Sequence, residues 1–133
     1  RPEQEAREWL AFAEDDLRVA RLAMKEGVFA QACFHAQQCA EKCLKALLTR
    51  EGQLVPRTHK IGDLWQELPQ AARDVLAPLE GEIRELDGYY TVTRYPDAVA
   101  GARPEGLPQE SHAEAALRVA ERCWQLTRDL VSR

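Results

Sequence analysis

The spacing of apolar residues along the chain is helical almost throughout. Between residues 10 and 24, apolar side chains recur every three or four positions, as they do along one face of an amphipathic helix. A second stretch of this kind runs from Phe29 to Arg50. A third runs from Leu79 to Tyr90 and should end near Thr93, because Pro96 cannot continue a helix. No strict alternation is long enough for a strand, so the pattern predicts an all-α protein.

Glycine and proline mark the ends of these helices. Gly27 and Gly52 follow the first and second helices, where a residue in the left-handed conformation commonly ends a helix. Between the second and third helices we expect a shorter amphipathic helix from Ile61 to Leu68. Pro69 ends it, because the residue before a proline avoids helical geometry, and a further turn or two should follow through Leu76.

The last helix follows a long connection. Residues 97–108 contain glycines and prolines without any periodicity, which predicts a loop. Ser111 and Glu114 have the spacing of a capping box, which we expect to start a helix whose apolar stripe runs from Ala113 to Val131. Four long helices, with short helical pieces in the second crossover, predict a four-helix up-and-down bundle. At this length we expect residues 1–133 to form a single domain.

Composition narrows the classes of function. The chain is 45% hydrophobic and 30% charged, with a net charge of −4, which argues against disorder and against extended DNA or RNA coating. No stretch approaches the roughly twenty apolar residues of a membrane span, and the N-terminus lacks a signal-peptide core, so we expect a cytoplasmic protein. The four cysteines lie in helical segments, which predicts reduced thiols in or near the core.

Charge is unevenly distributed along the chain. Residues 42–60 carry five basic residues against one acidic residue, a local +4, whereas residues 61–90 carry seven acidic residues against two arginines, a local −5. Lysines at a helix end favour the helix dipole and need no further explanation. The alternative is a site for phosphate or for an acidic partner.

The usual signs of catalytic and metal chemistry are missing. His35, Cys39 and Cys43 share one stripe of the second helix, but residues eight positions apart are separated by about 12 Å of helix rise and cannot bind one zinc ion. There is no glycine-rich phosphate loop, and Ser111 is interpreted as a helix cap. We therefore predict no metal, no cofactor and no catalytic residue.

The most unusual cluster extends from Tyr89 to Asp97. It combines three tyrosines with Arg94 at the expected end of a helix, the composition that stacks a nucleobase and binds a phosphate. Arg94 and Tyr95 could equally cap the helix and cover the end of the bundle. The candidate nucleotide- or substrate-binding residues are Arg94, Tyr95, Tyr90 and Asp97, with Lys42, Lys45 and His59 adding positive potential if the second helix ends nearby.

Several motifs together resemble the HEPN domain family. They are the stretch Ala36–Leu48 with its Gln-Gln-x-x-Glu-Lys pattern, His59, the run Arg94–Asp97, and the spacing of Trp9, Ala13, Asp15, Asp16, Leu17 and Ala20 in the first helix. The resemblance covers essentially the whole chain. It implies a helical bundle that usually dimerises and is often encoded beside a minimal nucleotidyltransferase, in a toxin–antitoxin-like pair. For that enzyme the chain looks like a substrate-binding or accessory subunit.

One motif of the wider family is absent. Its ribonucleases carry an arginine followed, after four to six residues, by a histidine. Counting from Arg94, those positions hold Val99, Ala100 and Gly101, and the next histidine is His112. Without that imidazole, the proton transfer of RNA cleavage lacks its usual base. Two hypotheses stay open: a non-catalytic binding subunit, which we favour, or a metal-independent endoribonuclease that uses another base.

The first helix also carries surplus apolar area. Trp9, Phe12 and Val19 lie outside the stripe that the bundle core requires. We therefore expect a homodimer or a higher even-numbered oligomer, the direction in which the family resemblance also points.

Overall fold

The computed structural model describes residues 1–92 and 108–133, and every regular element among them is helical. The all-α prediction is confirmed. Three long helices are α1 (Pro2–Lys25), α2 (Phe29–Arg50) and α8 (Glu110–Val131). The connection from α2 towards α8 contains α3 (Ile61–Glu67), α4 (Gln70–Leu76), the 3₁₀ helix η1 (Ala77–Leu79), α5 (Glu80–Glu85) and α6 (Gly88–Val92).

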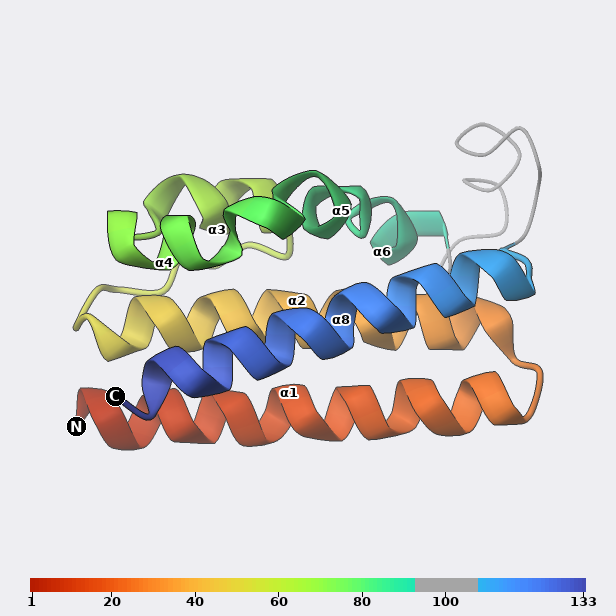
Figure 1. Ribbon diagram of the computed structural model, residues 1–133, viewed down its shortest axis with the longest axis horizontal. Helices are drawn as coiled ribbons and strands as arrows, with labels where there is room; N and C mark the ends of the chain where they lie inside the picture. Colours follow the sequence, from red (N-terminus) through yellow and green to blue (C-terminus); the bar gives the residue numbers. More distant parts are fainter. Residues whose placement is uncertain (93–107) are drawn as a thin grey trace.

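Helix α2 occupies the centre of the bundle. It runs antiparallel to α1, and α8 packs against both, while the short helices α3 to α6 lie along the other side of α2 (Figure 1). This central position explains why most residues of α2 are buried, including polar ones. Lys42 and Lys45 therefore lie within this central helix and not at a solvated helix end.

The predicted helix ends are largely confirmed. Gly27 and Gly52 adopt φ angles of 75° and 74°, the left-handed conformation that glycine accepts without steric cost. Leu68 is extended, with ψ 139°, as expected for the residue before Pro69.

The third long helix is not continuous, and this corrects the prediction. It is divided into η1, α5 and α6, with an interruption at Leu86 and Asp87. The Asp87 carboxylate accepts hydrogen bonds from the backbone amides of Ile61 at 2.8 Å and Gly62 at 3.2 Å. Asp87 thus satisfies amides at the start of α3, a tertiary contact that helical periodicity does not reveal.

The start of the last helix also differs from the prediction. Helix α8 begins at Glu110 with Gln109 as its N-cap, so Ser111 lies within the first turn instead of before it. The Gln109 backbone amide donates to Nδ1 of His112 at 2.9 Å. The capping box is therefore formed by Gln109 and His112 and not by Ser111 and Glu114.

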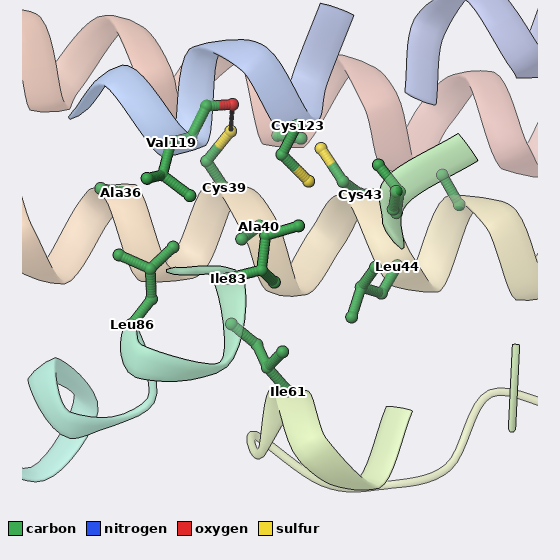
Figure 2. Close-up of a cluster of buried hydrophobic side chains, with 14 of the residues drawn as sticks. Ala36, Cys39, Ala40, Cys43, Leu44, Ile61, Ile83, Leu86, Val119 and Cys123 are labelled. Carbon is green, nitrogen blue, oxygen red and sulfur yellow. Dashed lines mark hydrogen bonds between the residues drawn. The ribbon is translucent and has the colours of Figure 1, made fainter. Parts of the chain in front are cut away.

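The core lies between α1, α2, α8 and the short helices. Leu44, Ile61 and Ile83 are fully buried in it (Figure 2). All four cysteines are buried and none forms a disulfide. The buried thiols agree with the sequence prediction. Tyr89, 9% exposed, takes the core position that periodicity predicted for Tyr90, which is only partly buried. The interruption before Gly88 shifts the helical register and accounts for this exchange.

Candidate functional site

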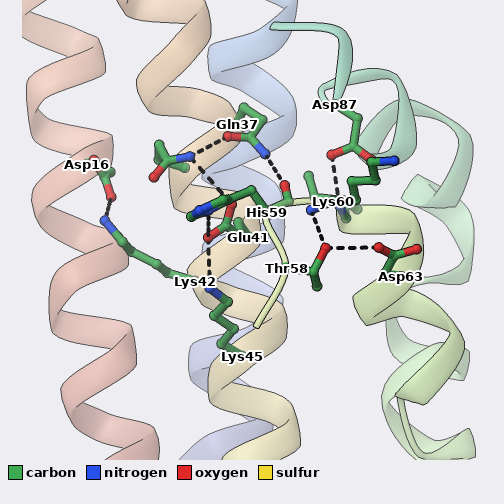
Figure 3. Close-up of polar contacts among 12 residues, drawn as sticks. Asp16, Gln37, Glu41, Lys42, Lys45, Thr58, His59, Lys60, Asp63 and Asp87 are labelled. Atoms are coloured by element: carbon green, nitrogen blue, oxygen red, sulfur yellow. Dashed lines mark hydrogen bonds and ion pairs between the residues drawn. The ribbon is translucent and has the colours of Figure 1, made fainter. Parts of the chain in front are cut away.

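A buried carboxylate is the centre of a polar network on α2, which we call the Glu41 network (Figure 3). Glu41 is 2% exposed, and its Oε2 lies 2.9 Å from Nζ of Lys45 on the next turn. Gln38 donates from Nε2 to Oε1 of Glu41 at 3.5 Å and to Oε1 of Gln37 at 2.6 Å. Burying a charge is costly unless it is paired, so these partners are what allow Glu41 to remain inside the bundle.

The Glu41 network fixes His59, which belongs to the connection before α3. Nδ1 of His59 lies 3.5 Å from Oε2 of Glu41, and Nε2 of Gln37 donates to the His59 backbone carbonyl at 3.1 Å. The His59 side chain is nonetheless 60% exposed. The imidazole is therefore held on its protein side while the rest of the ring faces solvent.

The ring of Tyr90 lies against the ring of His59. The two centroids are 4.8 Å apart at an interplanar angle of 14°, a stacked arrangement, and Phe34 of α2 lies 6.0 Å from the Tyr90 centroid. A pocket of about 360 Å³ opens beside this stack; its lining residues are Thr58, His59, Lys60, Asp87 and Tyr90. Two aromatic rings, one basic residue, one acidic residue and a threonine thus line one small cavity.

The connection that carries His59 is itself stabilised by polar contacts. Thr58 Oγ1 donates to Oδ2 of Asp63 at 2.9 Å and accepts from the backbone amide of Lys60 at 3.1 Å. Together with the Asp87 carboxylate on the start of α3, these bonds give the pocket wall a defined backbone conformation.

A second polar cluster lies between α1 and α2. Asp16, 8% exposed, receives the ammonium of Lys42 and Nδ1 of His35, the latter at 2.8 Å. Because an ionised carboxylate only accepts hydrogen bonds, Nδ1 of His35 carries a proton here. Burial raises the pKa of Asp16, but the bonds from His35 and Lys42 outweigh it and hold that pKa below its usual range.

The structure brings some of the predicted site residues together and separates others. His59 and Tyr90 are in contact and line the pocket. Lys45 reaches His59 only through Glu41, while Lys42 points to Asp16 on α1. Both lysines are therefore neutralised by buried carboxylates and do not supply free positive potential. Arg94, Tyr95 and Asp97 lie outside the described residues.

Reasoning from sequence missed the acidic members of these clusters. Asp16, Glu41 and Asp87 each carry a structural or site contact, and none was a candidate. A partial signal existed for Glu41, because it lies four residues before Lys45 on the same helix face and belongs to the Gln-Gln-x-x-Glu-Lys pattern. Asp16 was marked only by its spacing within the family resemblance, and nothing local marks Asp87. Their partners are 19 to 26 residues away.

Within the part of the chain that the structure describes, no group of histidine, cysteine and acidic residues is arranged to hold a metal ion. The same part contains no helix long and apolar enough to cross a membrane.

The geometry defines an all-α bundle whose central helix carries a polar network of Gln37, Gln38, Glu41 and Lys45 next to an aromatic pocket. The chain belongs to the HEPN family, since the HEPN domain model matches residues 6–130. It is similar to the protein of Methanocaldococcus jannaschii named "Putative toxin MJ1304", with 27% identity over 127 residues, which cover 90% of this chain and 83% of the relative.

Solved structures agree with this assignment. TT1696 from Thermus thermophilus is 36% identical and superposes with a TM-score of 0.77, over 93% of this chain and 96% of that one. The archaeal HEPN homologue ST0689 is 32% identical with a TM-score of 0.68, over 95% and 97%. An HEPN domain protein of Thermotoga maritima, 27% identical, gives a TM-score of 0.60 over 95% and 98%.

Proposed function

We propose that this chain is a non-catalytic HEPN-domain subunit that binds a nucleotide, or the acceptor of a nucleotidyl group, for a small nucleotidyltransferase partner. The observation that carries the proposal is the pocket beside the stacked rings of His59 and Tyr90. An aromatic face supports a planar base, and Lys60, a basic residue that lines the same cavity, suits a phosphate.

The sequence that continues from Tyr90 supports the same ligand class. Arg94, Tyr95 and Asp97 follow within seven positions, and an arginine binds phosphate through two parallel hydrogen bonds. In this proposal Lys60 and Arg94 contact the phosphate. Lys45 supports the site indirectly, because it pairs with Glu41, which lies beside His59. Lys42 is directed to Asp16 on α1 instead.

A toxin–antitoxin-like setting is part of the proposal. A relative that matches across 90% of this chain has the word toxin in its name, which supports a two-component system in which the present chain acts with its transferase. Affinity purification from the native host, followed by mass spectrometry, should recover a small nucleotidyltransferase. Recovery of the chain without any such protein would contradict this part of the proposal.

Self-association is proposed on the exposed apolar residues of α1. Phe12, Val19 and Leu22 are 58%, 42% and 62% exposed, whereas Trp9 is partly buried with the Lys45 ammonium 5.3 Å from its ring centroid. The proposed interface therefore includes Leu22, which the sequence analysis did not name, and leaves out Trp9, which it did. A patch of this kind favours association of two copies.

One observation favours ribonuclease activity as a second candidate. Nδ1 of His59 lies 3.5 Å from the carboxylate of Glu41 while the side chain is 60% exposed, so a carboxylate orients an accessible imidazole as in general base catalysis. His59 would then act as the base, the role of the histidine that is missing from the ribonuclease motif. His112, in contrast, accepts a hydrogen bond from Gln109 at the start of α8.

Calorimetric titration tests the binding proposal. ATP should bind wild-type protein, and Lys60→Gln and Arg94→Lys should each weaken binding roughly tenfold, because a glutamine carries no charge and a lysine cannot reproduce the two-pronged arginine contact. Lys25→Gln, a change at an exposed lysine in the last turn of α1, is the matched control and should bind like wild type. Equal affinities for all four proteins would remove the pocket from consideration.

A further inference from the structure

Three thiols meet in the core where α2 packs against α8. Cys39 and Cys43 are one turn apart on α2, and Cys123 projects from α8 towards them (Figure 2). All three residues are fully buried. Figure 2 shows the Cys43 and Cys123 thiols directed towards each other, and Cys39 Sγ donates to the Ala120 carbonyl at 3.9 Å. Sulfur atoms of two different helices therefore face one another across a packed interface.

The direction of the side chains distinguishes the pairs. Cys39 and Cys43 leave the same helix nearly parallel to each other, so their Cβ atoms do not converge as a disulfide requires. Cys43 and Cys123 approach from opposing helices, and their sulfur atoms are neighbours in the packed core. The cross-helix pair is thus the one whose geometry suits a covalent bond.

We propose that Cys43 and Cys123 form an oxidation site at which a hydroperoxide converts the two thiols into a disulfide joining α2 to α8. In the first step one thiolate attacks the peroxide; a sulfur–oxygen bond forms, the oxygen–oxygen bond breaks, and the leaving oxygen departs as water or alcohol with the thiol proton. The second thiol then attacks the sulfenic sulfur. The sulfur–sulfur bond forms, the sulfur–oxygen bond breaks, and water leaves.

Burial controls how this site reacts. Desolvation, followed by the neighbouring thiols of Cys123 and Cys39, raises the pKa of Cys43, so little thiolate exists in the closed bundle. Reaction therefore follows local separation of α8 from α2, and a small uncharged oxidant such as hydrogen peroxide is the suitable class. The disulfide, once formed, links positions 80 residues apart in the chain and opposes any further separation of the two helices.

Tryptic mapping of the wild-type protein tests the assignment directly. Reduced protein is treated with hydrogen peroxide under native conditions, then denatured, alkylated and digested. Cys43 falls in the peptide Cys43–Lys45, Cys123 in Cys123–Arg128, and both Cys33 and Cys39 in Glu26–Lys42. The expected product joins Cys43–Lys45 to Cys123–Arg128 and lowers the intact mass by two hydrogens. A cross-link that involves Glu26–Lys42, or none when unfolded protein does oxidise, overturns the proposal.

Substitutions provide an independent measurement. Cys123→Ala should abolish the cross-link, whereas Cys33→Ala, at another fully buried cysteine ten positions before Cys43, should retain it. Oxidised wild-type protein should also melt on the order of 10 °C higher than reduced protein, because the cross-link restricts the unfolded chain. If the cross-link is confirmed but the melting temperature is unchanged, the disulfide does not fit the native packing of α2 against α8, and the proposal is refuted.

Discussion

Replacing Glu41 by leucine should destabilise the bundle by about 3 kcal/mol, although leucine is itself suited to a core. The Glu41 side chain is 3% exposed and that of Lys45 is 11% exposed, so the substitution leaves an ammonium group almost without water or a counter-charge. Breaking such a buried pair costs about 3–5 kcal/mol. We take the lower end because the Lys45 ammonium keeps the Trp9 ring, 5.3 Å away, as a partner.

A second substitution should restore the stability that Glu41→Leu removes. With Lys45→Met added to Glu41→Leu, neither charge remains, and the double variant should lie within about 1 kcal/mol of wild type. The exposed pair of Arg21 and Glu121, which also joins two helices, is the matched control. Glu121→Leu should cost less than about 1 kcal/mol, because solvent already screens that pair.

Urea denaturation followed by far-ultraviolet circular dichroism measures these differences. At this chain length, 3 kcal/mol corresponds to a fall in melting temperature of roughly 10 °C, which provides a second readout. The reasoning is refuted if Glu41→Leu costs less than about 1 kcal/mol, or if the double variant is no more stable than the single one.

Three further predictions concern pH, assembly and activity. The pKa of Asp16 in the folded protein lies below its ordinary 3.8. On acidification, the Asp16 carboxylate therefore binds a proton at a higher pH in the unfolded chain than in the folded protein. Wild type should therefore lose unfolding free energy below about pH 4 more steeply than Asp16→Asn, and parallel acid titrations of stability would contradict this. In sedimentation, wild type should exceed the 15.1 kDa of one chain and Phe12→Glu should shift towards it; a dilute wild-type monomer contradicts the interface. Purified protein should not cleave RNA above background, and cleavage lost in His59→Ala or Arg94→Ala would favour the ribonuclease instead.

The positions of the long helices could be predicted from sequence because helical periodicity is a local property. Residues three or four apart share a face, so α1, α2 and α8 were recognisable without any knowledge of their neighbours. Glycine and proline likewise act through their own backbone geometry, which is why Gly27 and Pro69 marked helix ends correctly.

The site depended on contacts between segments that are distant in the chain. Nothing in the pattern around Asp87 indicates that its carboxylate satisfies the first amides of α3, and that contact accompanies the interruption that places Tyr90 against His59. The lysines show the same limit. A local count of charges made residues 42–60 basic, but folding brings Asp16 to Lys42 and buries Glu41 beside Lys45. Because a buried charge requires a partner, the tertiary structure decided which of those charges remained free.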